Sequence, residues 1–391
     1  MRDVHLTLAH PISTSRRRLA GALAAALLVV GCDAAPDAGD PDVDGGTAPG
    51  DGGGTPGDGG VDPVAPPLPP LSDYADYIDP SAPYQLPLDT DGWAIVTPGA
   101  QHKIIYVSSS TGDDDNDGLT EATAVASLDA ARGLVDGGSS DWILLRRGDV
   151  FGGIRLRGEA TGESAEHPML IGAYGEGARP RLDGSLLLWD THEHLVLRDL
   201  HLRRVGKYCL DVLGRVRNLY LENVVTEGCE SRIQGSDDAQ LHGVTLHRVM
   251  LLDAHHEHDG GWSAHADRIS AVYMANVDGI LIEESFADHA GWVEGYHGDQ
   301  SAGPQPPSQF SHDFYLQGNN ANIVFRDNIA ARGASFGAQV RPGGAVVGNV
   351  FVGNNAAFFT AGDRPSLVER NVVTIAGNKR ADLIGAIGWG L

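Results

Sequence analysis

The stretch Ile323-Val324-Phe325-Arg326-Asp327-Asn328-Ile329 decides the fold, because its pattern returns along the second half of the chain. The pattern is apolar–x–apolar, then a polar turn, then an apolar residue that is often β-branched. We aligned its copies on one polar turn position, at Asp199, Asn223, Arg248, Ser285, Asn328, Asn349 and Asn371. The steps between them are 21 to 25 residues, apart from two of 37 and 43. A short strand-and-turn unit at this period indicates stacked coils, because one coil cannot bury its own inward side chains.

The repeat therefore predicts an all-β fold, a right-handed parallel β-helix (a solenoid), over residues 103–391. Leu128, Ala131 and Leu134 recur at helical spacing, which predicts a short helix within residues 120–135 that caps the first coil. The asparagines of the repeat are expected at a bend, where Asn tolerates a left-handed backbone and can bond its copies in neighbouring coils. They are Asn223, Asn328, Asn349 and Asn371.

The first 32 residues have the pattern of an export signal. Three arginines, at positions 16–18, precede an apolar run over residues 19–31 that ends at Cys32. This run is too short for a permanent membrane span and fits the apolar core of a signal peptide. Because Val29-Val30-Gly31-Cys32 resembles a bacterial lipobox, the prediction is a lipoprotein signal with lipidation at Cys32; the alternative is an ordinary secretory signal. The protein is then exported and lipid-anchored at the bacterial cell envelope, on its periplasmic or outer surface.

Residues 33–70 are rich in Asp, Gly and Pro and cannot bury enough apolar surface to fold. We interpret them as a disordered tether, and residues 71–102 as a segment that wraps the start of the domain. The tether holds 8 of the 52 acidic residues, so about a third of the net charge of −24 lies outside the folded part. An acidic chain disfavours nucleic acid as a partner. The chain stops inside an apolar run without a polar cap, which predicts a C-terminally incomplete β-helix.

Several segments resemble the N-terminal signature and ordinary coils of the pectin-lyase-like superfamily of secreted parallel β-helix proteins. They read YVSSSTGDDDNDGLT (106–120), SLDAARGLV (127–135), WILLRRGDVF (142–151), IGAYGEGARPRLDG (171–184), NANIVFRDNIAARG (320–333) and RPGGAVVGNVFVGNN (341–355). The resemblance implies a carbohydrate-active protein, in most cases a polysaccharide lyase and in some a hydrolase. The Gly-His-Gly and Arg-Ile-Lys motifs of polygalacturonase-like hydrolases and the R-x-P-x-x-R run of pectate lyases are absent from the sequence.

The two long steps are insertions that hold most of the candidate chemistry. They span about residues 253–270 and 289–311 and are expected side by side on the flank where an extended polymer would lie. The favoured hypothesis is a lyase that acts on a uronate-containing polysaccharide. It needs a base for the proton on carbon 5 and a group that neutralises the neighbouring carboxylate. The catalytic candidates are His265, His312 and Arg341, and the binding candidates are Asp267, Arg268, Trp292, His297, Asp299, Asp313 and Gln339.

Two other functions stay open. A hydrolase would use paired carboxylates, for which Asp259, Asp267, Asp299 and Asp313 are available. A non-catalytic surface module would bind glycans, with Trp residues stacked on sugar rings. The sharpest expectation is that His312, Asp313 and Arg341 line one cleft with His265 and Asp267, and that Gly343-Gly344 allow a substrate to approach the backbone. The alternative is that Arg341 only forms an ion pair with Asp363 on the following coil.

A metal site and a disulfide are the remaining expectations. Asp113, Asp115 and Asp117 match the first half of a calcium loop, but its twelfth position is Ala124. Ca²⁺ or another divalent cation is one interpretation, and a turn rich in Asp and Asn is the other. Cys209 and Cys229 lie 20 residues apart, a little less than one coil. They can form a disulfide between adjacent coils of an exported protein, or serve as two small buried side chains.

Overall fold

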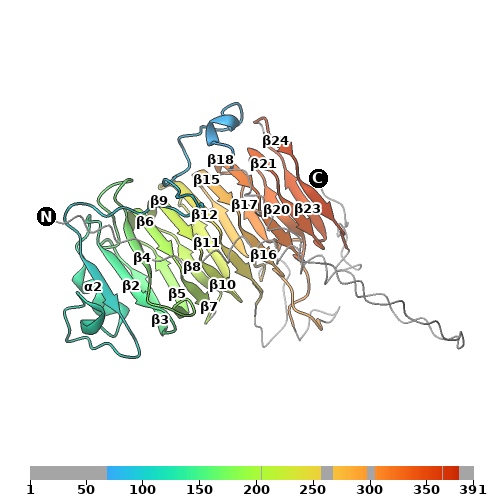
Figure 1. Cartoon of the computed structure of the whole chain (residues 1–391). Helices are drawn as coiled ribbons and strands as arrows, with labels where there is room; N and C mark the ends of the chain where they lie inside the picture. The colour runs from blue at the N-terminus through green and yellow to red at the C-terminus, as the bar shows by residue number, and fades with distance from the viewer. Residues whose placement is uncertain (1–67, 204, 257–266, 297–303, 363, 378–391) are drawn as a thin grey trace, which may run out of the picture. The chain divides into compact units, whose positions relative to one another are not determined.

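The computed structural model describes residues 68–203, 205–256, 267–296, 304–362 and 364–377. The chain separates into two units at Asp73/Tyr74, and the second unit, Tyr74–Leu391, contains all the strands of the described residues. Within the second unit, parallel strands form three rows, and from β6 to β23 each successive coil adds one strand to each row (Figure 1). This unit is the parallel β-helix that the repeat predicts.

The strands of the first row form a ten-stranded sheet. In spatial order they are β1 (Ile104–Val107), β2 (Trp142–Arg146), β4 (Met169–Tyr174), β6 (Thr191–Arg198), β9 (Arg215–Glu222), β12 (Leu241–His247), β15 (Val277–Glu283), β18 (Ala321–Arg326), β21 (Ala345–Val347) and β24 (Leu367–Glu369).

The second and third rows belong to one sheet, because β5 (Arg181–Leu188) pairs with a strand of each row and with β3 (Val150–Leu156). The second row holds β7 (His201–Arg203), β10 (Val225–Glu227), β13 (Met250–Leu252), β16 (Phe286–Asp288), β19 (Ile329–Ala331), β22 (Val350–Val352) and β25 (Val372–Thr374). The third row holds β8 (Tyr208–Val212), β11 (Glu230–Gln234), β14 (Val272–Ala275), β17 (Phe314–Leu316), β20 (Phe336–Val340) and β23 (Ala356–Thr360).

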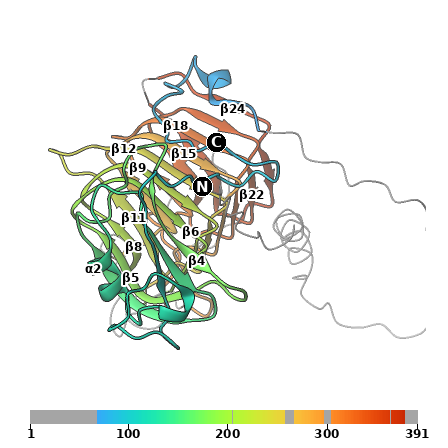
Figure 2. The same ribbon diagram turned by 60° about the vertical axis from the view of Figure 1, so that its left-hand side comes forward.

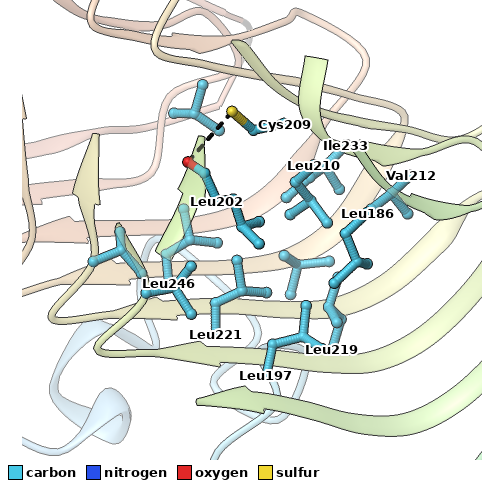
Figure 3. Packing of buried hydrophobic residues seen from close by; sticks show 14 of the residues in the cluster. Leu186, Leu197, Leu202, Cys209, Leu210, Val212, Leu219, Leu221, Ile233 and Leu246 are labelled. Carbon is cyan, nitrogen blue, oxygen red and sulfur yellow. Dashed lines mark hydrogen bonds between the residues drawn. The ribbon is translucent and has the colours of Figure 1, made fainter. Parts of the chain in front are cut away.

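The core between the rows is built from columns of like side chains. One column of the first row pairs Leu195, Leu219, Val244, Ile280 and Ile323 in register, and each is fully buried. First-row leucines, among them Leu197 and Leu219, lie across the core from Leu186 on β5 and Leu210 of the third row (Figure 3). Burial of each such side chain contributes about 1.5–3 kcal/mol, so the stack of coils is the main source of stability.

A short helix covers one end of the stack. The predicted helix is shorter than expected: a 3-10 turn, η2 (Glu121–Thr123), precedes α2 (Leu128–Leu134). The Ser127 hydroxyl caps α2 by accepting from the Ala130 N–H, which fixes its start. α2 lies at the end of the stack opposite β24 (Figure 2). A further 3-10 turn, η1, spans Leu71–Tyr74, and no helix in the described part of the chain has the length and apolar content that a bilayer crossing requires.

The predicted asparagine ladder exists, but Asn223 does not belong to it. The N–H of Asn328 donates to Asn349 Oδ1 at 2.9 Å, and that of Asn349 donates to Asn371 Oδ1 at 3.0 Å. Asn223 instead adopts a left-handed backbone with φ of 55° and bonds to Asp199.

The repeat alignment above is therefore wrong by one residue in its second part. The left-handed column consists of Asp199, Asn223, Arg248, Glu284, Asp327, Gly348 and Arg370, each one residue before the ladder position. The bend thus uses two adjacent columns: one supplies the left-handed backbone and the next supplies the side-chain ladder.

The outer face of the first row carries charges that alternate in sign from coil to coil, and we call it the covered face. It consists of Arg198, Glu222, His247, Glu283 and Arg326, paired in this order. Glu222 lies 2.6 Å from Arg198 and 2.9 Å from His247, and Glu283 lies 2.6 Å from Arg326.

Residues 74–97 run over this face. The Ala94 N–H donates to Glu222 Oε1 at 2.8 Å, and the Thr245 hydroxyl donates to Tyr84 O at 2.5 Å. The covered face is buried as a result, and its charges are matched by one another rather than by water.

One covalent link joins two coils. Cys209 on β8 and Cys229, just before β11, form a disulfide, and their Cα atoms lie 5.6 Å apart. Both residues are fully buried in the core, where the Cys209 sulfur lies beside Leu202 O (Figure 3). The two side chains are thus a bridge between adjacent coils and part of the core at the same time.

Candidate functional site

The two insertions both connect the second row to the third. The first joins β13 to β14 and the second joins β16 to β17, so their last residues stand at the start of neighbouring third-row strands. Parts of both insertions, with the candidates His265, His297 and Asp299, lie outside the described residues, as does Cys32.

A cleft of about 270 Å³ lies where the insertions reach the third row. The side chains that line it are basic, aromatic or neutral polar, with one alanine: Arg268, Gln309, Phe310, His312, Tyr315, Ser335, Phe336, Gln339, Arg341, Asn355 and Ala356. Four residues expected from the sequence, namely Arg268, His312, Gln339 and Arg341, are thereby brought together. None of the described residues that line the cleft is an Asp or a Glu.

Arg341 follows β20 and is held by neutral partners. Its Nε donates to Gln339 Oε1 and its Nη1 donates to Gln317 Oε1, both at 2.8 Å. Its guanidinium carbon lies 5.1 Å from the centre of the Tyr315 ring. Arg341 forms no ion pair with any of the described residues, and Asp363 lies outside them. The guanidinium is thus oriented by amides and an aromatic ring, and its charge is left for a ligand.

His312 is buried in the wall of the cleft with 2% of its surface exposed. Burial, and then the charge of Arg341, lower its pKa to about 3, so the imidazole is neutral. Its Nδ1 lies 3.4 Å from the Phe336 N–H and accepts from it, which leaves the proton on Nε2. An imidazole with this pKa is a weak base near neutral pH, so the geometry favours a hydrogen-bond donor over the base expected from the sequence.

Tyr315 is a cleft residue that the sequence analysis missed. Its ring packs 4.8 Å from the His312 ring and lies below the Arg341 guanidinium. β17 pairs with β20 so that Tyr315 stands beside Gln339, while the flanking Phe314 and Leu316 face the core. The alternation of Phe-Tyr-Leu was the signal that could have placed it on the outer face.

Three other candidates lie elsewhere. Asp313 is fully buried, its carboxylate packs against Gly333, and it does not line the cleft. Asp267 is half-buried and does not line the cleft. Trp292 is half-buried too: its Nε1 donates to Arg332 O at 2.8 Å and its ring packs 4.5 Å from that of His289. Of the acidic residues expected in the cleft, Asp267 and Asp313 do not line it, and Asp299 lies outside the described residues.

A second cleft of about 340 Å³ shares Arg341 with the first. It is also free of carboxylates among its described lining residues, and it adds Arg364, Asn320 and Asn322. Gly343 and Gly344 line it, but a Cβ there would lie 2.5 Å from Ser366 Oγ and 2.3 Å from Ile323 O, respectively. The packing of adjacent coils thus requires glycine at both positions, and a role of these glycines toward a substrate stays a prediction.

The predicted calcium loop is built as a turn. Asp113 Oδ1 accepts from the Asp115 N–H at 3.1 Å, and Asp117 Oδ1 accepts from the Thr123 hydroxyl at 2.7 Å. No group of three or more His, Cys, Asp or Glu side chains in the described ranges is arranged to hold a metal ion. Cation binding at this loop stays a prediction from the sequence, and the local hydrogen bonds account for these carboxylates without it.

No family model matches the chain, and no curated protein matches it either. Among solved structures, an alginate lyase from Paenibacillus sp. str. FPU-7 is similar over 71% of this chain and 97% of its own, with 15% identity and a TM-score of 0.40. The pectate lyase Pel9A is similar over 70% and 80%, with 15% identity and a TM-score of 0.38. A GH136 lacto-N-biosidase from Eubacterium ramulus is similar over 69% and 67%, with 16% identity and a TM-score of 0.34.

Proposed function

We propose that the cleft binds an acidic polysaccharide and that the protein is a lyase for a uronate-containing polymer. The observation that carries the proposal is the cleft's charge. Two arginines and no carboxylate line it among the described residues, in a chain of net charge −24. A basic cleft on an acidic protein selects an anionic ligand.

The lyase reaction removes the proton on carbon 5 of a uronate and expels the oxygen at carbon 4. Arg341 binds the carboxylate in fork geometry, and Arg268 adds a second positive charge, which stabilises the negative charge that develops next to that carbon. Tyr315 reacts as the phenolate: its oxygen takes the proton and becomes a phenol, while the His312 Nε2–H donates to a sugar oxygen. The electron pair from the broken C–H bond forms a carbon–carbon double bond. The bond between carbon 4 and the leaving oxygen breaks, and the phenol just formed at Tyr315 donates its proton to that oxygen, which completes the elimination.

The hydrolase alternative is weaker. Glycoside hydrolysis uses two carboxyl groups on opposite sides of the bond that breaks. Of its four candidates, Asp267 and Asp313 do not line the cleft, and the other two lie outside the described residues. A non-catalytic module that binds an acidic glycan is the second candidate, because the low pKa of His312 removes one base from the cleft.

Turnover distinguishes the two candidates. Purified protein is incubated with alginate, polygalacturonate and a glycosaminoglycan, and unsaturated products are followed by ultraviolet absorbance. We expect absorbance to grow with one polymer and to fall about 100-fold in Tyr315→Phe, a loss typical of a removed proton-transfer group. Saturable binding of a polymer without any product would establish the binding module, and binding of none of the acidic polymers would refute the site.

We also propose that the protein is exported and anchored through a lipid on Cys32. The support is the sequence pattern alone, since this residue lies outside the described part of the chain. Cells fed a fatty acid with an alkyne tag should label the wild-type protein but not Cys32→Ser. Equal labelling of both would contradict the anchor.

A further inference from the structure

A buried glutamate stands next to the cleft without lining it. Glu230 is the first residue of β11 and has only 7% of its surface exposed. Its Oε2 accepts from the Ser270 N–H at 2.8 Å. Ser270 ends the first insertion, two residues after the cleft residue Arg268. The carboxylate therefore holds the point at which this insertion rejoins the β-helix.

The same link continues to the next coil. Ser270 Oγ accepts from the His312 N–H at 3.2 Å, and Ser311 Oγ accepts from the Ile269 N–H at 3.2 Å. Arg268 and His312, which come from different coils, are thus connected through Ser270 to one carboxylate.

The charges around Glu230 are mostly positive. Lys207 precedes β8, Arg232 lies on β11 itself, and Arg268 precedes β14; all three favour the ionised carboxylate. Arg232 Nε and Nη2 donate to the two carboxylate oxygens of Asp211 on β8, at 2.7 and 2.9 Å. Asp211 therefore offsets the positive charge of Arg232. The phenols of Tyr208 and Tyr273 complete the charged and titratable groups that face it from these elements.

Burial opposes these charges and raises the pKa of Glu230 to about 7. The folded pKa lies above the unfolded value of 4.5. The fold is therefore most stable with Glu230 protonated, and it loses part of that stability as the pH rises from about 4.5 through about 7. An ionised Glu230 thus costs stability, as is common for groups that serve a site rather than the fold.

We propose that Glu230 is a positioning residue, which in its ionised form fastens Arg268 and His312 in the geometry that the cleft needs. A carboxylate accepts a stronger hydrogen bond from the Ser270 N–H than a neutral acid does. The fastening is independent of the ligand's identity, whereas its effect on catalysis rests on the proposed function.

Glu230→Gln tests the proposal, because the amide has the shape of the acid and no charge. At pH 8 we expect this variant to unfold at the same or a higher urea concentration than the wild type. The Ser270 amide should nevertheless exchange its hydrogen about tenfold faster, because a charge-assisted hydrogen bond has been replaced by a neutral one. Cleavage of the polymer should fall about tenfold in kcat/KM at pH 8, with the acid limb near pH 7 lost.

Glu222→Gln is the matched control, because Glu222 is a buried glutamate of the covered face. It should lower stability and leave both the Ser270 exchange and the acid limb as in the wild type. A Glu230→Gln variant with unchanged Ser270 exchange, or one that is less stable at pH 8, would overturn the positioning role. Faster Ser270 exchange in a protein that cleaves no polymer would support the positioning role and refute only the proposed lyase.

Discussion

The outer faces of the first and third rows are built from the same coils but differ in whether their charged side chains are paired. On the covered face, positive and negative side chains alternate and pair, as Glu283 does with Arg326 at 2.6 Å. In the cleft of the third row, Arg268 and Arg341 have no ion pair among the described residues. Matched buried charges maintain a structure, whereas an unmatched charge in a cleft is available for a ligand.

The largest effect is expected on the covered face. Glu283→Gln leaves the Arg326 guanidinium buried without its carboxylate, and only 6% of that side chain is exposed. The loss of one partner from a buried ion pair costs about 3–5 kcal/mol, so urea unfolding should shift strongly to lower concentration. Activity per folded molecule should stay unchanged. A stability loss below about 1 kcal/mol, which is typical of an ion pair on the surface, would show that water reaches the charges of the covered face.

The covered face should also determine how stability depends on alkaline pH. Burial alone would lower the pKa of His247, but Glu222, Glu284 and Glu283 outweigh it and raise the pKa to about 9. The folded value lies above the unfolded 6.5, so the stabilisation is complete below pH 6.5 and is lost as the pH rises through 9. The loss is about 3 kcal/mol, because a tenfold difference in proton affinity between the folded and unfolded states corresponds to about 1.4 kcal/mol.

Urea unfolding at a series of pH values measures this loss. His247→Gln, which cannot be protonated, serves as the comparison: its stability should change less between pH 6.5 and 9 than that of the wild type. Parallel curves for the two proteins would mean that His247 is not charged in the folded state.

Arg341→Lys tests the cleft with little effect on the fold. The lysine keeps the charge but loses the planar fork that is held by Gln339 and Gln317. We expect kcat/KM on the acidic polymer to fall about 100-fold, with the unfolding curve unchanged. A lysine variant with full activity would show that a point charge suffices and that fork recognition is not used.

Arg364→Gln should have the smallest effect. Arg364 is exposed in the second cleft, so it contributes at most a screened contact to a bound polymer. Affinity for a long acidic oligomer should fall about threefold, while affinity for a dimer should not change. An equal loss for both lengths would mean that the second cleft belongs to the same binding unit as the first.

Local sequence patterns were enough for the fold and for part of the cleft. The columns that include Leu219 and Ile280 were visible as repeated apolar positions, and His312 and Arg341 were expected to line one cleft, as they do. The offset of Asn223 from the ladder was not visible, because one turn residue can supply either the left-handed backbone or the side-chain bond. A local pattern cannot choose between these without the neighbouring coil.

Burial explains the other differences between what the sequence predicts for individual residues and what the structure shows. The pKa of His312 depends on its burial and on Arg341, and both Phe336 and Arg341 come from the next coil rather than from the sequence around His312. Glu230 reads as a surface residue in the sequence, and it is covered only because the first insertion returns over it at Ser270. Properties that arise from contacts between coils need the stacked structure.

Whether the cleft binds a polysaccharide through its carboxylates is measured most directly by calorimetry. One titration uses a uronate oligomer, and the other uses the same oligomer with its carboxyl groups reduced to alcohols. We expect the protein to bind the acidic oligomer only, and to bind it more weakly at high salt. The Arg268→Gln, Arg341→Gln double variant should keep its fold and lose this binding. Equal binding of the two oligomers, or acidic binding that survives in the double variant, would contradict recognition through the carboxylates.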